Sequence, residues 1–86
     1  MSVKENLIAV KSLIDTPEKM FAFQDNAAAF QYAMDAAIEP FDEDSYRDVV
    51  IFLRNANGSP GLLEYLRRSS HADIMGLFER SIKAAS

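Results

Sequence analysis

The sequence contains no cysteine, no tryptophan, one histidine, three glycines and three prolines among its 86 residues. Without cysteine there is neither a disulfide nor a thiolate metal site, and one histidine supplies too few ligands for a metal centre. Glycine-rich phosphate loops and the G-x-S-x-G motif are missing as well. These absences predict a protein that is not an enzyme and that needs no metal and no cofactor.

Long apolar runs are also missing. No stretch approaches the roughly 20 consecutive apolar residues that span a bilayer. Charged residues such as Glu5 and Lys11 interrupt the apolar residues near the N-terminus, so the pattern does not fit a signal peptide. Together with the lack of cysteine, this predicts a cytoplasmic protein with no membrane contact.

The composition is that of an ordinary globular protein, with 49% hydrophobic and 26% charged residues, and the length predicts a single domain over residues 1–86. The net charge of −4 is uneven, because residues 1–43 hold three lysines and eight acidic residues, whereas residues 44–86 hold six basic and five acidic residues. Such a balance argues against nonspecific binding to nucleic acid. It allows the front half to meet a basic protein partner.

Apolar residues recur at helical spacing through the front half. The spacing predicts a first helix over about residues 3–14 and a second that begins at Thr16-Pro17 and runs to about Gln24. A third helix is expected to begin after Asn26 and to end before Pro40. Its apolar residues form one continuous stripe: Phe30, Ala33, Met34, Ala37 and Ile38.

The back half contains one ambiguous stretch. Residues 49–53 form a β-prone run that fits a buried strand, but Asp42 at an acidic helix start favours a helix, and no second strand candidate is present to pair with. We therefore expect a fourth helix from Asp42, followed by a loop over residues 55–59. Ser59-Pro60 begins a fifth helix that runs to about Arg68, and Ser70 begins a sixth.

The predicted fold is therefore all-α, a compact bundle of five or six short helices. Displacing the sequence by 43 residues aligns Thr16-Pro17 with Ser59-Pro60 and Met34 with Leu77, which indicates two similar three-helix halves. The rules that begin any two short helices would give the same alignment, so both explanations stay open.

Six residues are candidates for contact with a partner. Glu39, Asp42, Glu43 and Asp44 form an acidic cluster, which lacks the central glycine of a calcium loop and fits either the electrostatics of a helix start or a basic partner. Phe21 and Tyr32 do not lie on the apolar stripes of their helices, and aromatic residues are enriched in interfaces.

Two further features have simpler explanations. Arg67-Arg68 and the other basic residues of the back half could form a nucleic-acid surface, but the last helix carries Asp73 where a reader helix has base-contacting residues. His71, in the first turn of that helix, has no partner at metal-ligand spacing, so we expect a surface or cap-adjacent role.

Residues 3–50 resemble the leader domain of nitrogen-fixation-cluster precursor peptides. The stretches that carry the resemblance are Glu5-Asn6-Leu7, Asp15-Thr16-Pro17-Glu18, Phe30-Gln31-Tyr32-Ala33 and Phe41-Asp42-Glu43-Asp44. The chain departs from that family at Ala37-Ile38, where the family has a glycine, and it has no Gly-Gly cleavage site. The resemblance implies a helical recognition domain that another protein binds.

The sequence thus predicts a small acidic helical module, such as a regulator, adaptor, accessory subunit or inhibitor, that docks on a protein partner. The alternatives are a nucleic-acid-binding regulator that uses its last two helices, and a leader-like recognition domain bound by a modification enzyme. Self-association is the other contact that the sequence leaves open.

Overall fold

The computed structural model describes residues 2–38, 42–57 and 62–86. Over these residues the chain forms six α-helices, one 3-10 turn and no strand, which confirms the all-α prediction. The elements are α1 (Val3–Lys11), η1 (Ser12–Ile14), α2 (Pro17–Gln24), α3 (Ala27–Ala37), α4 (Glu43–Asn57), α5 (Leu62–Arg68) and α6 (His71–Ala85).

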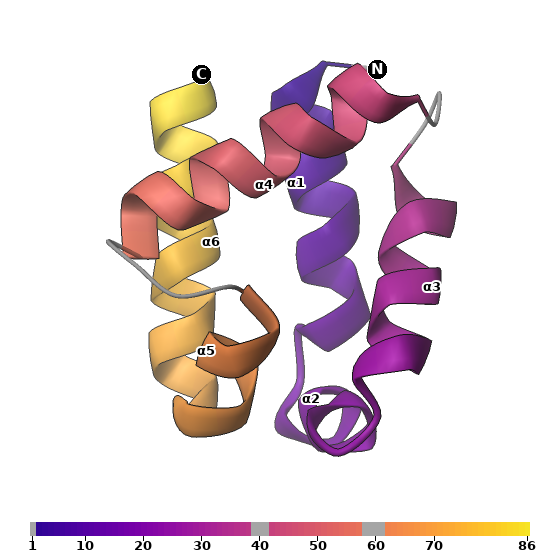
Figure 1. The fold of residues 1–86 in the computed structure, drawn as a ribbon. Helices are drawn as coiled ribbons and strands as arrows, with labels where there is room; N and C mark the ends of the chain where they lie inside the picture. Colours follow the sequence, from indigo (N-terminus) through magenta and orange to yellow (C-terminus); the bar gives the residue numbers. More distant parts are fainter. Residues whose placement is uncertain (1, 39–41, 58–61) are drawn as a thin grey trace.

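Three helices stand side by side and the others close the two ends (Figure 1). Helix α1 lies between α3 and α6 and contacts both, while α4 crosses them at one end and packs mainly on α6. Helices α2 and α5 meet at the other end. The body that results is compact, with a Cα radius of gyration of 11.6 Å and extents of 27 × 23 × 21 Å.

Side-chain oxygens begin most of the helices. Each accepts a backbone N–H that has no partner inside its own helix, which is the usual role of an N-cap. The pairs are Ser2 with the amide of Glu5 (3.2 Å), Thr16 with Lys19 (3.3 Å), Asn26 with Ala29 (3.1 Å), Asp42 with Ser45 (2.6 Å) and Ser70 with Asp73 (3.2 Å). The predicted starts at Thr16, Asn26, Asp42 and Ser70 are therefore confirmed.

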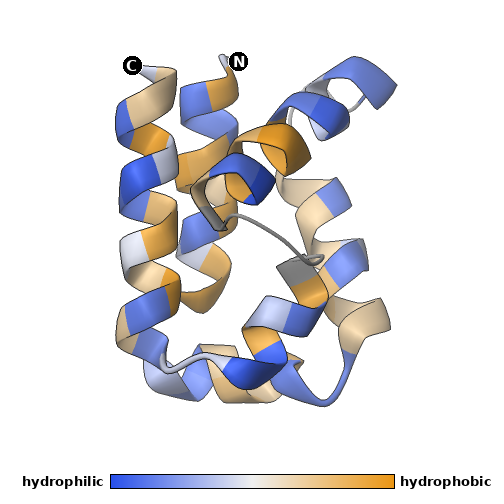
Figure 2. Cartoon of the chain, turned by 60° about the vertical axis from the view of Figure 1, so that its left-hand side comes forward, coloured by the Kyte–Doolittle hydropathy of each residue, from blue (hydrophilic) through white to orange (hydrophobic). Residues whose placement is uncertain are grey.

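One core joins all six helices. Its buried members are Leu7, Val10, Ile14, Met20, Phe30, Met34, Ile38, Val49, Leu53, Leu66, Ile74, Leu77 and Phe78. Along each helix in Figure 2 hydrophobic and hydrophilic residues alternate, as expected where one face is buried. The predicted stripe of α3 is confirmed, since Phe30, Met34 and Ile38 are buried.

In the back half, the structure shows that the β-prone stretch is helical and that the predicted loop begins too early. Residues 49–53 lie inside α4, so the strand alternative is wrong. The loop predicted from Asn55 is wrong at its start, because α4 continues to Asn57 and Ala56 packs against the core. The other part of that loop and the predicted start at Ser59-Pro60 lie outside the described residues.

The two halves share their order of helices. With a displacement of 43 residues, α1 falls within α4, and α3 falls almost wholly within α6. Their surroundings differ, because α6 packs extensively on α1 and α4, whereas α3 packs on α1 and α2. The equivalence of the two halves stays a prediction.

Candidate functional site

The acidic cluster serves the start of α4. Asp42 accepts the Ser45 amide, and this hydrogen bond holds the pKa of the Asp42 carboxyl below its ordinary value of 3.8. Asp44 pairs with the guanidinium of Arg47 on the same helix. Glu43 is exposed in the first turn, and Glu39 lies outside the described residues. Two of these carboxylates therefore have structural roles within the chain.

Phe21 and Tyr32 are the most exposed of the large hydrophobic residues described, with 61% and 79% of their surface accessible. Phe21 is exposed because its neighbours occupy the inner face of α2: Met20 is buried, and Phe23 packs on Phe30 with ring centroids 5.3 Å apart. Tyr32 points outwards from α3, where Phe30 and Met34 take the buried positions. This placement agrees with the expectation that both side chains leave the apolar stripes.

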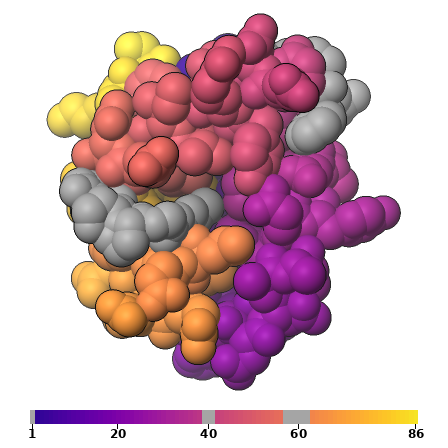
Figure 3. Space-filling model, viewed as in Figure 1, coloured from indigo at the N-terminus to yellow at the C-terminus, as the bar shows by residue number. Residues whose placement is uncertain are grey.

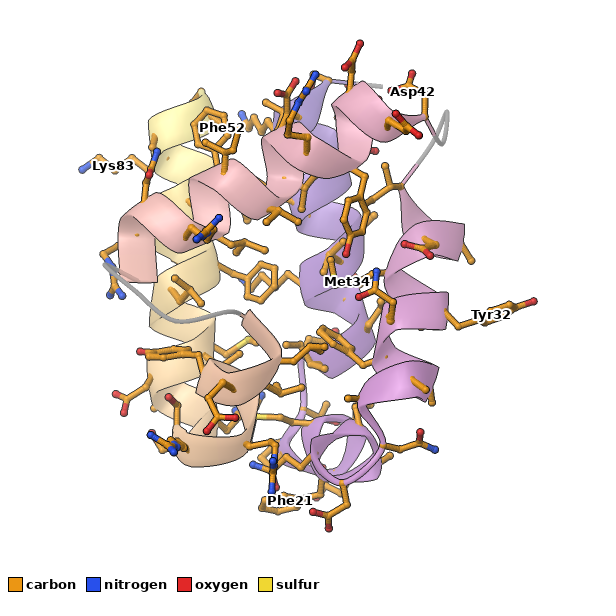
Figure 4. The ribbon with its side chains drawn as sticks, viewed as in Figure 1. Phe21, Tyr32, Met34, Asp42, Phe52 and Lys83 are labelled. Atoms are coloured by element: carbon orange, nitrogen blue, oxygen red, sulfur yellow. The ribbon has the colours of Figure 1, made fainter. Side chains whose placement is uncertain are left out.

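The predicted partner residues do not form one surface (Figure 4). Phe21 lies at the end of the molecule closed by α2, Asp42 lies at the opposite end, and Tyr32 projects sideways from α3. The acidic cluster and the two aromatic side chains thus mark separate regions.

Two exposed carboxylates flank Phe21. Glu18 precedes it by three residues and Asp25 follows it by four, which places both about one helical turn away. Neither forms an ion pair within the described part of the chain. The sequence pattern did not single them out, although their spacing from Phe21 was visible in it.

The cation nearest to this face along α2 is engaged elsewhere. The ammonium of Lys19 lies 2.9 Å from the Asp15 carboxylate and 3.4 Å from the Ser12 carbonyl oxygen. The Lys19 hydrogen bond is the main cause that lowers the pKa of Asp15 from 3.8. Lys19 therefore neutralises Asp15 and leaves Glu18 without a counter-charge.

A small hollow adjoins the end of α2. Its volume is about 300 Å³, and it is lined by Gln24, Asp25, Ala27 and Arg67. It forms where α2 and α5 lie side by side (Figure 3). The two helices are joined by a 3.2 Å hydrogen bond that the side-chain amide of Gln24 donates to the backbone carbonyl oxygen of Leu66. Arg67 on its far side is 4.0 Å from Glu64. The hollow is therefore mixed in charge.

The histidine joins two elements. The half-buried His71 places Nε2 3.0 Å from the carbonyl oxygen of Ile14, which ties the first turn of α6 to the end of η1. His71 directly follows the Ser70 N-cap, as the cap-adjacent alternative predicts. The contact of its imidazole with a backbone oxygen 57 residues away was not predicted.

The basic residues of the back half are divided among several contacts. Arg68 pairs with Glu64 at 2.8 Å, as their i,i+4 spacing on one helix predicts. The i,i+4 spacing of Glu79 and Lys83 also favours an ion pair, but this expectation is wrong, because Glu79 instead lies 3.9 Å from Lys11 of α1. Asp73 and Glu79 are both exposed on α6, which places negative charge on the helix that would read DNA.

The described residues hold neither a cluster of metal ligands nor a helix that could cross a membrane. Among residues 2–38, 42–57 and 62–86, no group of three or more histidine, aspartate or glutamate side chains could hold a metal ion. None of the helices described has the length and apolar character to cross a membrane. Comparison with protein families, with curated proteins and with solved structures finds no match.

Proposed function

We propose that this protein is a small acidic helical module that works in the cytoplasm by docking on a protein partner, without catalysis of its own. The observation that carries the proposal is the exposure of Phe21 and Tyr32 on helices whose opposite faces build the core. Large aromatic side chains give much contact area for little loss of conformational entropy, and they are enriched at interface centres.

The mechanism is the rigid presentation of side chains. Helices α2 and α3 are fixed by Met20, Phe30 and Met34 in the core, so their outer faces are already in place before a partner arrives. A partner that covers Phe21 or Tyr32 removes apolar surface from water at about 25 cal/mol per Å². The net charge of −4 favours a partner of opposite charge and speeds its approach.

The test is affinity capture from cells of the source organism, with the wild-type protein and the variant Phe21→Ala/Tyr32→Ala as bait. We expect a stoichiometric protein that the wild type retains and the double variant loses. The control is Ile8→Ala, which removes a 44% exposed side chain from α1 and should leave capture unchanged. The same proteins on wild-type and double-variant baits would refute the proposal.

A nucleic-acid-binding regulator is the second candidate. The observation in its favour is that Arg67 and Arg68 are exposed at the end of α5, directly before α6. Their pairing with Glu64 and the acids of α6 weigh against it. Titration with duplex DNA decides, because such binding weakens steeply as salt rises.

The leader-like function is the third candidate. The resemblance covers α1, α2, α3 and part of α4, so a modification enzyme would meet the same outer faces of α2 and α3. A gene for such an enzyme beside this one would support it. Solution mass measured at several concentrations tests self-association as the other mode of contact.

A further inference from the structure

We propose that the outer face of α2 binds a lysine- or arginine-rich segment of the partner. Phe21 covers the apolar part of that segment, and the carboxylates of Glu18 and Asp25 pair with its cations. The inference rests on the proposed function and specifies which of the two exposed aromatic side chains forms the contact and what chemistry it meets. We call this surface, formed by Glu18, Phe21 and Asp25, the Phe21 face.

Glu18 and Asp25 form no ion pair among the described residues, although Glu18 lies in the first turn of α2, where its charge also suits the helix dipole. Thr16 caps α2 and Asn26 caps α3, so neither Glu18 nor Asp25 acts as an N-cap. In contrast, Asp42 caps α4, and Asp44 pairs with Arg47. Two exposed charges of one sign on either side of an exposed ring therefore complement a cationic partner.

The ring itself adds to this preference. The face of an aromatic ring attracts a lysine ammonium or an arginine guanidinium, and the methylene stems of those side chains pack on it. Lys19, the cation of the same helix, is held by Asp15 and the Ser12 carbonyl oxygen. The Phe21 face is thus open to a cation from outside.

The face around Tyr32 does not define an occupant in the same way. About one turn before Tyr32 stand Ala28 and Ala29, and about one turn after it stand Asp35 and Ala36. The half-buried Asp35 accepts a 3.2 Å hydrogen bond from the Gln31 side chain. Tyr32 is therefore the control for Phe21: it is aromatic and even more exposed, but it has one neighbouring carboxylate, which a Gln31 hydrogen bond holds, in place of two exposed carboxylates without a partner in the described part of the chain.

Arg67 distinguishes binding at the Phe21 face from binding at another surface. It lines the hollow together with Asp25, so its positive charge opposes a cationic segment bound there. Removing it should strengthen the binding of a basic peptide. A basic peptide that bound at another surface would be indifferent to Arg67.

The experiment is an NMR titration of the full-length ¹⁵N-labelled protein at low salt. The probe is a synthetic amphipathic helical peptide of lysine and leucine, and the control peptide has glutamate in place of lysine. We expect shifts centred on residues 17–28 with the lysine peptide only. Shifts centred on residues 42–48 or on residues around Tyr32, equal binding of the glutamate peptide, or no binding would overturn the proposal.

Variants then test the individual contacts. Glu18→Gln/Asp25→Asn removes the two negative charges and should weaken binding of the lysine peptide about tenfold. Phe21→Ala removes the aromatic contact and should weaken it by about the same factor, which corresponds to about 1.4 kcal/mol. Arg67→Ala should strengthen it about twofold, and Tyr32→Ala should leave it unchanged. Loss of binding in Tyr32→Ala, or no effect of Glu18→Gln/Asp25→Asn, would refute the assignment.

This outcome is separable from that of the proposed function. If capture of a cellular partner depends on Tyr32 alone, docking stands and the Phe21 face is wrong. If neither aromatic side chain affects capture, docking itself fails, whatever the peptide does.

Discussion

At the scale of single residues, Asp15 and Asp42 are held in the charged form by identified donors. The Lys19 side chain lowers the pKa of Asp15 and the Ser45 amide lowers that of Asp42, both from 3.8. Because the pKa is lower in the folded state, each contributes stability that is present above about pH 3.8 and is lost as pH falls through the folded pKa. We expect NMR titration of the side-chain carboxyls to give midpoints below 3.8 for both.

The variant Lys19→Met removes the donor that lowers the pKa of Asp15 and keeps the Ser45 amide that lowers the pKa of Asp42. It should return the Asp15 midpoint towards 3.8 and leave that of Asp42 unchanged. An Asp15 midpoint that stays low without Lys19 would show that another group holds the charge.

Phe30 is a second residue with a measurable role. Its side chain is fully buried and packs on Phe23, so Phe30→Ala leaves a cavity and should lower the free energy of unfolding by about 3 to 5 kcal/mol. Tyr32→Ala, two residues away, removes a side chain that is 79% exposed and should change it by less than about 0.5 kcal/mol. Urea unfolding measures both, and a similar loss in the two variants would mean that α3 faces the core differently.

At the scale of elements, the sequence predicts best what short-range chemistry decides. The starts of α2, α3, α4 and α6 depend on a capping side chain and the next turn, so Thr16, Asn26, Asp42 and Ser70 mark them correctly. The sequence predicts too early an end for α4. Asn55 favours a loop by its own local preference, but Ala56 packs against core residues that are distant in the sequence, and the helix continues to Asn57. The hollow could not be predicted either, since Gln24 meets Leu66 across 42 residues of chain.

For the candidate site as well, the sequence predicts what depends on one helix and misses what depends on how the helices pack. Exposure of Phe21 and Tyr32 was visible as a departure from the apolar period, because a helix has one buried face. That Phe21 and Asp42 lie at opposite ends depends on how α2 and α4 pack, and no spacing within one helix encodes it.

At the scale of the whole molecule, the core is shared between the two halves. Seven of its buried members come from residues 7–38 and six from residues 49–78, and α1 lies between helices from both halves. Segments of about 40 residues seldom hold a core alone. We therefore expect fragments 1–41 and 42–86 to be largely unfolded when separate, although each contains three of the described α-helices.

Far-UV circular dichroism and thermal unfolding test this expectation. Each fragment should show low helicity and no cooperative transition, and an equimolar mixture should regain helicity, because α1 of one fragment can then pack on α4 and α6 of the other. A reversed-sequence peptide mixed with fragment 42–86 controls for unspecific association. A cooperative transition in fragment 1–41 alone would instead make the first three helices an independent unit, with α6 as an addition to it.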